Sequence, residues 1–60
     1  MILRNRARCR LCGDVVESSH RHDFKWCSCH SVAVDGGRAY IRRVGRLEDT
    51  EELSEFDAGD

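Results

Sequence analysis

The four cysteines of this chain lie in two close pairs, Cys9-x-x-Cys12 and Cys27-x-Cys29, within only 60 residues. Thiolates this close in sequence can hold one tetrahedral metal ion, and two such pairs roughly fifteen residues apart close a loop around it. A chain of this length forms one domain with a thin apolar core, and such domains usually need a metal or disulfides for stability. The cysteine spacing therefore restricts the fold more than any other feature of the sequence.

Two disulfides are the main alternative to a metal ion. A disulfide within either pair would close a very short, strained ring, so the bonds would have to join one pair to the other. The opening Met1-Ile2-Leu3 runs directly into Arg4 without an apolar signal segment, and no apolar run is long enough to span a membrane. These features predict a cytoplasmic protein with reduced thiols, in which paired cysteines more often bind metal. We therefore expect Zn²⁺, with disulfides and redox or iron–sulfur chemistry as alternatives.

The expected metal ligands are the four thiolates, Cys9, Cys12, Cys27 and Cys29. Four cysteine ligands leave no open position for a substrate, so the site would be structural. His30 directly follows Cys29 and is an alternative fourth ligand, because Cys27 and His30 have C-x2-H spacing. His20 and His22 are weaker candidates, and the ordinary interpretation of all three histidines is a solvated or hydrogen-bonded side chain.

Charge divides the chain into two parts. Residues 1–46 contain all ten basic residues and four of the eleven acids, a formal charge of +6. Residues 47–60 contain the other seven acids and no base, a formal charge of −7. We expect residues 1–46 to form a basic β domain, and residues 47–60 to form a short acidic helix or tail that packs on it or trails from it. Leu53 and Phe56, three residues apart, would give the helix a narrow apolar stripe.

The basic part has the patterns of β-strands and turns. Residues 3–11 alternate, with arginines on one face of the expected strand and small or apolar side chains on the other. Residues 14–18 indicate a second short strand. Asp-Gly-Gly between the β-rich runs 31–35 and 38–44 predicts a hairpin. The expected fold is a small metal-stapled β-rich domain, a zinc-ribbon-like antiparallel sheet with a short acidic C-terminal helix.

Several motifs resemble a family of small uncharacterised zinc-ribbon-like proteins found mostly in phage and prophage genomes. The matching residues are Cys9-x-x-Cys12-Gly13-Asp14, Ser18, His22-Asp23-Phe24-Lys25-Trp26-Cys27-x-Cys29, Val34-Asp35-Gly36-Gly37-x-x-Tyr40-x-Arg42-Arg43 and Glu51-Glu52-Leu53-Ser54. They cover most of residues 9–54. His30 departs from the family pattern, in which a glycine is expected after the second cysteine pair. The resemblance implies the fold, a metal and a viral or prophage context, without an established activity.

Arginines provide the clearest indication of function. Those expected on two strands are Arg4, Arg6, Arg8, Arg10, Arg42, Arg43 and Arg46. If the two strands are neighbours, the guanidinium groups form one patch that could contact phosphates. The ordinary interpretation is a solvated face on an edge strand, where charge prevents aggregation. The acidic segment could fold back on this face and neutralise it, or bind a basic partner. Phe24, Trp26 and Tyr40 could stack on bases, although in so small a domain we expect them in the core.

The sequence favours a binding module over an enzyme. It contains no nucleophile triad, glycine-rich phosphate loop or paired inward carboxylates, and the chain is too short for a pocket of ordinary size. We expect no small-molecule substrate and no membrane partner. The expected function is a zinc-binding protein-interaction module, encoded by a phage or prophage, that binds a host or viral protein in the host cytoplasm. The alternative is a nucleic-acid-binding zinc ribbon that uses the arginine-rich face.

Overall fold

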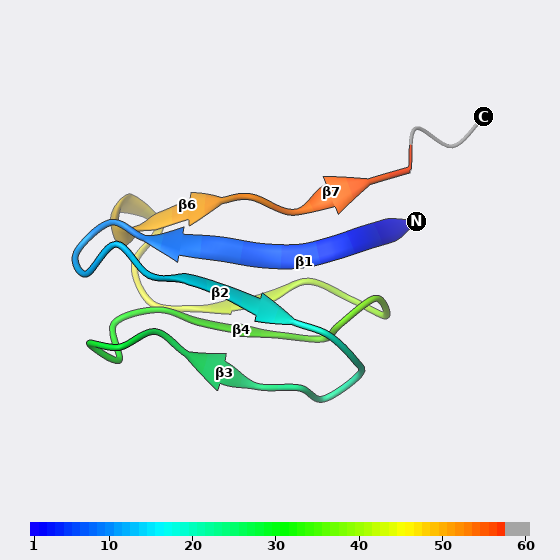
Figure 1. Cartoon of the computed structure of the whole chain (residues 1–60), viewed down its shortest axis with the longest axis horizontal. Helices are drawn as coiled ribbons and strands as arrows, with labels where there is room; N and C mark the ends of the chain where they lie inside the picture. Colours follow the sequence, from blue (N-terminus) through cyan, green and yellow to red (C-terminus); the bar gives the residue numbers. More distant parts are fainter. Residues whose placement is uncertain (58–60) are drawn as a thin grey trace.

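The computed structural model describes residues 1–57. Its elements, in chain order, are β1 (Ile2–Cys9), β2 (Val15–Ser18), β3 (Lys25–Trp26), β4 (Ala33–Asp35), β5 (Arg42–Val44), the 3-10 turn η1 (Leu47–Asp49), β6 (Thr50–Glu52) and β7 (Glu55–Phe56). Within these residues the strands form two antiparallel sheets (Figure 1). One sheet has the order β2-β1-β6, with β7 also paired to β1, and the other has the order β3-β4-β5. The predicted β-rich antiparallel fold is confirmed.

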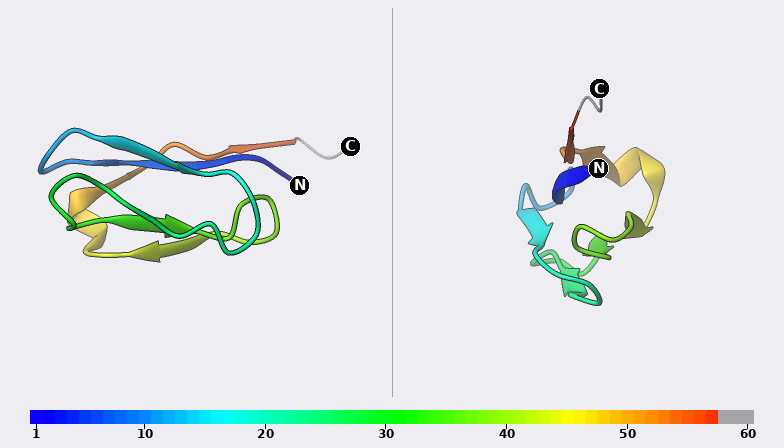
Figure 2. Two further views of the ribbon diagram at one scale, coloured as in Figure 1. Left: turned by 60° about the horizontal axis from the view of Figure 1, so that its bottom comes forward. Right: turned by 90° about the vertical axis from the view of Figure 1, so that its right-hand side faces the viewer.

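The two sheets surround a narrow interior, as the view along the long axis shows (Figure 2). Its fully buried apolar side chains are small or medium in size: Ala7, Cys9, Cys27, Val32, Ala33 and Val34. Cys9, Cys27 and Val32 form one cluster, against which Val16 packs. The apolar core is therefore thin, as the length of the chain predicts. Among residues 1–57, no helix has the length and hydrophobicity required to cross a membrane.

Strand β1 organises the larger sheet. It pairs with β2 along one edge, where Arg6 lies opposite Glu17 and Ala7 opposite Val16. Along its other edge it pairs with β6 and then β7. Its predicted alternation is present, because Asn5, Ala7 and Cys9 are buried while Arg4 and Arg8 are exposed.

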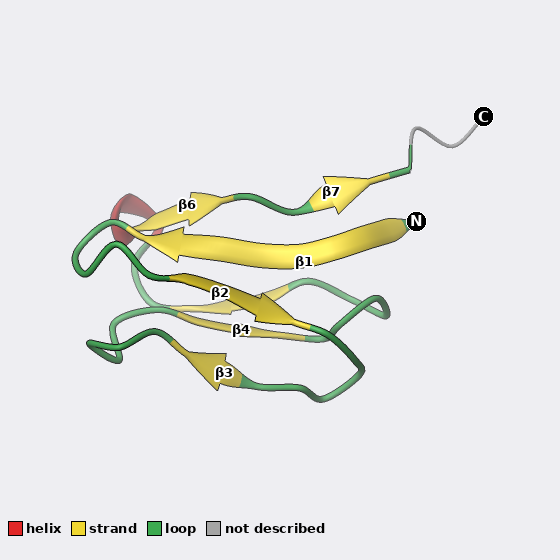
Figure 3. Ribbon diagram, viewed as in Figure 1, coloured by secondary structure: helices red, strands yellow, loops and turns green. Residues whose placement is uncertain are grey.

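The predicted acidic helix in residues 47–60 is wrong. Among the described residues of this segment there is only the 3-10 turn η1, and Thr50 already has extended backbone angles (Figure 3). The chain continues as β6 and β7, which pair with β1. A short isolated helix is marginal because its first turn is costly to nucleate, whereas the edge of β1 offers backbone hydrogen bonds and arginine partners. Residues 58–60, which end the predicted helix or tail, lie outside the described residues.

The Asp-Gly-Gly hairpin prediction is confirmed, since β4 pairs with β5 in antiparallel register. The connection spans residues 36–41 and is longer than a two-residue turn. Gly36 has a φ of 107° and Gly37 a φ of 52°. A Cβ on Gly36 would lie 1.9 Å from the carbonyl oxygen of Tyr40, and one on Gly37 would lie 2.2 Å from the carbonyl carbon of His20. Both positions therefore require glycine for conformation and for space.

A buried asparagine joins the hairpin connection to β1. The side-chain amide of Asn5 lies 3.0 Å from the carbonyl oxygen of Asp35, 2.9 Å from that of Gly37 and 3.1 Å from that of Tyr40. Asn5 is only 1% exposed, so these carbonyl groups have little access to water as an alternative partner. Ser18 of β2 adds a second anchor, because its hydroxyl accepts the Gly37 N–H at 2.8 Å. Sequence analysis missed Asn5, which lies between two arginines without a motif to mark it.

We expect Asn5→Ala to lower the free energy of unfolding by about 1–3 kcal/mol, because it leaves buried carbonyl groups without a donor. Urea denaturation followed by circular dichroism measures this change. Arg8→Ala on the same strand is the matched control, since its contact with Glu51 is exposed and 3.8 Å long. We expect the control to differ from wild type by less than about 0.5 kcal/mol. Equal losses in the two variants would show that the Asn5 hydrogen bonds do not stabilise the fold specifically.

Candidate metal centre

The two cysteine pairs meet at one end of the molecule. The Sγ atoms of Cys9, Cys12, Cys27 and Cys29 all lie within 4.8 Å of one another. Cys29 Sγ lies 3.7 Å from Cys9 Sγ and 3.6 Å from Cys27 Sγ, and all four thiols are free. A zinc ion with Zn–S bonds near 2.3 Å has a tetrahedron edge of roughly 3.8 Å. The four sulfur atoms are therefore close enough to hold one metal ion.

The first cysteine pair begins at Cys9, the last residue of β1, and continues through a tight turn. The Cys9 N–H donates to the carbonyl oxygen of Asp14 at 2.9 Å, and the Gly13 N–H donates to that of Cys9 at 2.8 Å. Gly13 has a φ of 81°, in the left-handed region that favours glycine. This turn places the sulfur of Cys12 within 4.8 Å of that of Cys9.

The second cysteine pair lies in the connection between β3 and β4. The Cys27 N–H donates to the carbonyl oxygen of Val32 at 2.9 Å, and the His30 N–H donates to that of Cys27 at 3.0 Å. The Val32 N–H points at Cys27 Sγ, 3.4 Å away. His30 has a φ of 59°, a conformation that glycine adopts more easily. This backbone requirement explains why a glycine is expected where this chain has His30.

The sulfur atoms differ in acidity because their surroundings differ. Burial disfavours the Cys27 thiolate, but the N–H groups of Val32 and Ser31 outweigh it and lower the pKa of Cys27 to about 6. The N–H groups of Asp14 and Cys29 lower the pKa of Cys12. The N–H of Cys12 likewise acts to lower the pKa of Cys9. Burial and the neighbouring sulfur atoms outweigh this effect and raise the pKa of Cys9 to about 11. Crowded thiolates repel one another, and a bound cation removes this repulsion and favours the deprotonated sulfurs.

A carboxylate joins the two turns independently of the sulfur atoms. Asp14, two residues after Cys12, accepts hydrogen bonds at Oδ2 from the N–H of Ser28, at 2.9 Å, and from the Ser28 hydroxyl. Ser28 is the residue between the cysteines of the second pair. These bonds lower the pKa of Asp14, so it is charged at neutral pH. Asp14 therefore fixes the short Cys27-x-Cys29 turn, a role that sequence analysis did not assign to it.

The three histidines lie outside the sulfur group. Among the described residues, the group with ligand atoms close enough to share an ion contains the four cysteines and no histidine. The ring of His30 lies against Trp26, with centroids 5.6 Å apart. His22 Nδ1 lies 3.2 Å from the hydroxyl of Tyr40, and His20 Nδ1 lies 3.9 Å from a carboxylate oxygen of Asp23.

The expectation of a core position is wrong for Phe24 and Trp26, which are 42% and 41% exposed. Their rings make an edge contact with centroids 5.5 Å apart. Trp26 belongs to β3, a two-residue strand at the edge of its sheet. Among residues 1–57, no strand other than β4 pairs with β3. The two rings pack on each other, and Trp26 also lies against His30.

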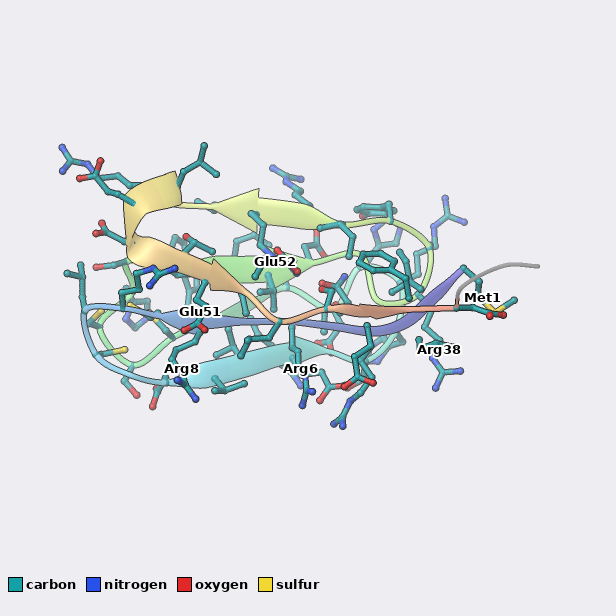
Figure 4. The ribbon with its side chains drawn as sticks, turned by 90° about the horizontal axis from the view of Figure 1, so that it is seen from above. Met1, Arg6, Arg8, Arg38, Glu51 and Glu52 are labelled. Carbon is teal, nitrogen blue, oxygen red and sulfur yellow. The ribbon has the colours of Figure 1, made fainter. Side chains whose placement is uncertain are left out.

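The arginines predicted to form one patch lie in several places. Strands β1 and β5 belong to different sheets. The ion pairs are Arg4 with Glu17 (2.9 Å), Arg6 with Glu55 (2.5 Å), Arg8 with Glu51 (3.8 Å), Arg42 with Asp35 (4.0 Å), Arg43 with Glu52 (2.7 Å) and Arg46 with Glu48 (3.4 Å). Arg10 has no ion pair among residues 1–57. Figure 4 shows Arg6 and Arg8 near the acidic strands. The acidic segment thus neutralises much of the arginine charge.

Comparison with known proteins gives one match. No curated protein matches the chain, and no solved structure does. The family described as "Domain of unknown function (DUF7695)" matches residues 1–45. The matched residues include both cysteine pairs and strands β1–β5, whereas β6 and β7 lie beyond them. The chain therefore belongs to the DUF7695 family.

Proposed function

We propose that this protein is a small zinc-binding protein-interaction module of the zinc-ribbon type. The observation that carries the proposal is the set of four free sulfur atoms within 4.8 Å of one another. A tetrahedral all-sulfur set is typical of zinc or an iron–sulfur centre. Sulfur separations of 3.6 and 3.7 Å match the edge of a tetrahedron around a single ion. Zn²⁺ is the single ion that most commonly has this coordination in structural sites.

The proposed ion is structural, and the function is binding. Four thiolates leave no coordination position for a substrate or for an activated water. Each sheet contributes to the site, because Cys9 ends β1 while Cys27 and Cys29 lie between β3 and β4. A bound ion would therefore hold the two sheets together at the end where Cys9 and Cys27 belong to the apolar cluster. Chemistry at the metal would require a ligand to leave, which would remove that connection.

Exposed aromatic side chains support a protein partner. Trp26, in the edge strand β3, and Phe24, directly before that strand, are exposed and precede the second cysteine pair in the chain. Aromatic anchors of this kind contribute strongly to protein interfaces when a partner buries them. The alternative nucleic-acid-binding function is weakened by the ion pairs, because arginines already paired with glutamates must lose those contacts to reach a phosphate. The viral or prophage origin and the cytoplasmic location stay predictions.

We expect the purified protein to carry one Zn²⁺ per chain and to lose its cooperative unfolding transition after exhaustive chelation. Native mass spectrometry, elemental analysis and circular dichroism measure these properties. Cys29→Ser should weaken zinc binding by more than about a hundredfold, because it removes a direct ligand. His30→Gly is the matched control and should keep the affinity, since glycine suits the left-handed backbone at this position. The reverse result, with His30→Gly losing zinc, would identify His30 as the fourth ligand.

We expect Asp14→Ala to transfer zinc to a competing chelator about tenfold faster than wild type, because the turn that positions Cys27 and Cys29 loses both hydrogen bonds. Ser28→Ala should have a smaller effect, since the Ser28 N–H can still donate to Asp14. A chromogenic chelator reports the rates. Asp49→Ala removes a carboxylate near the first cysteine pair without removing a side-chain bond to either turn, and should match wild type. Equal acceleration by Asp14→Ala and Asp49→Ala would show a general charge effect.

We expect the full chain, immobilised through a tag, to capture a stoichiometric protein from lysate after nuclease treatment. Replacing Phe24 and Trp26 with serine should abolish that capture while leaving the zinc content unchanged, because interface aromatics carry much of the binding energy. Leu47→Ser is the matched control, because Leu47 is an apolar residue that is 91% exposed and lies in η1 rather than in or next to β3. Retention of nucleic acid alone, lost on nuclease treatment, would instead establish the nucleic-acid-binding alternative.

A further inference from the structure

One edge of β1 is covered by a segment outside the family match. Strands β6 and β7 occupy this edge, and they follow the last matched residue, 45. The opposite edge of β1 is paired with β2, which lies within the matched residues. The part of the chain matched by the family thus includes the central strand β1, and among residues 1–57 the strands that pair with its second edge, β6 and β7, belong to the acidic segment.

The covering segment binds mainly through its backbone. In β6, Glu52, Glu51 and Thr50 lie opposite Ala7, Arg8 and Cys9. In β7, Phe56 lies opposite Ile2 and Glu55 opposite Arg4, with a register irregularity between the two pairs. The N–H of Leu53 donates to the carbonyl oxygen of Arg6 at 3.1 Å, and that of Asp57 donates to Met1 at 2.9 Å. Any extended peptide could supply these backbone groups.

The side chains around this edge select acidic residues. Arg8 lies by Glu51 on β6 (Figure 4), and Arg6 contacts Glu55 on β7. Arg43 approaches from β5 of the other sheet, with Nε 2.9 Å and Nη2 2.7 Å from the two carboxylate oxygens of Glu52. Although partial burial disfavours the Glu52 carboxylate, the Arg43 and Ser54 hydrogen bonds lower its pKa.

Ser54 fixes the register between the two acidic strands. Its hydroxyl lies 3.1 Å from the N–H of Arg6 and 2.9 Å from Nη2 of Arg43. The edge therefore recognises three carboxylates and one hydroxyl at fixed positions along an extended chain.

The segment is held without burial of large apolar side chains. Phe56 is 56% exposed, and Leu53 is only half-buried. The two strands have three and two residues. Glu51 and Glu55 are partly exposed in their ion pairs, where water and salt weaken the attraction. A segment with few apolar contacts and exposed hydrogen bonds opens more readily than the core strands.

We propose that this edge of β1 is a docking site for an acidic, extended segment of a partner protein, and that residues 50–56 occupy it in cis as a displaceable strand. The inference rests on the proposed function and names the class of partner. Binding occurs by strand addition, in which β1 supplies N–H and C=O groups and Arg6, Arg8 and Arg43 supply specificity. A nucleic acid could contact the guanidinium groups, but its phosphodiester chain lacks the N–H donors that pair with the β1 carbonyl groups.

The test uses the full zinc-loaded chain and a fluorescein-labelled peptide with the sequence of residues 50–57. A variant with Glu51, Glu52 and Glu55 all changed to glutamine weakens the cis strand without changing its length. Fluorescence anisotropy at low salt should show about tenfold tighter peptide binding to this variant than to wild type. The reason is that the cis strand of the variant has fewer ion pairs and competes less strongly with the peptide for the edge. A peptide with glutamine in place of its three glutamates should bind at least about tenfold more weakly.

Further substitutions in the glutamine variant locate the site. Arg43→Gln should weaken peptide binding, whereas the matched control Arg46→Gln should leave it unchanged, because Arg46 contacts Glu48 outside the edge. Equal affinity of wild type and the glutamine variant would overturn the proposal. Tighter binding of an oligothymidylate of the same charge than of the acidic peptide would also overturn it.

Hydrogen exchange of the wild-type chain provides a measurement that does not depend on the variants. The amides of Leu53 and Asp57, which donate to β1, should exchange at least about tenfold faster than amides of β4. Exchange as slow as in β4 would contradict a displaceable strand.

The zinc content of each sample is also measured, so that the two proposals can fail separately. Peptide binding by a protein that contains no zinc would refute the proposed metal site and retain the docking site. A protein that contains zinc but does not bind the peptide would refute the docking site alone.

Discussion

The convergence of four sulfur atoms at one end of two small sheets is the constraint on which this structure depends. Cys9 and Cys27 are both buried and belong to the same apolar cluster as Val32. The cysteines are thus part of the core as well as candidate ligands. Without a cation, thiolates at these separations repel one another. A bound cation attracts all of the thiolates and so offsets this repulsion. The stability of this end therefore depends on what the sulfur atoms bind.

Polar contacts stabilise the rest of the molecule where the apolar core is small. Asp14 connects the two cysteine turns through Ser28. In the middle of β1, Asn5 joins the first sheet to the hairpin connection of the second. The Asn5 hydrogen bonds are buried and specific in direction, so they help to fix how the sheets lie relative to each other, which a few valines and alanines cannot do.

The distribution of charge follows from the same shortage of apolar contacts. The strongly basic and strongly acidic parts of the chain lie against each other, and arginines on both sheets contact glutamates of residues 50–56. Exposed ion pairs contribute little individually, so this arrangement supplies selectivity and solubility more than stability. A strand that is held mainly by backbone hydrogen bonds and exposed ion pairs suits exchange with another chain.

Local sequence patterns predicted the pairing of the cysteines, the alternation of β1 and the glycine-dependent hairpin. Each depends on residues close in sequence, whose spacing and backbone preferences are local properties. The state of the acidic segment, the exposure of Phe24 and Trp26, and the roles of Asn5 and Asp14 depend instead on contacts between distant parts of the chain. The segment had glutamates and an apolar stripe that suited a helix, but the open edge of β1 lies more than forty residues away in the chain. Competition between local helix formation and such a distant partner depends on which strands come together, and neighbouring residues do not encode it.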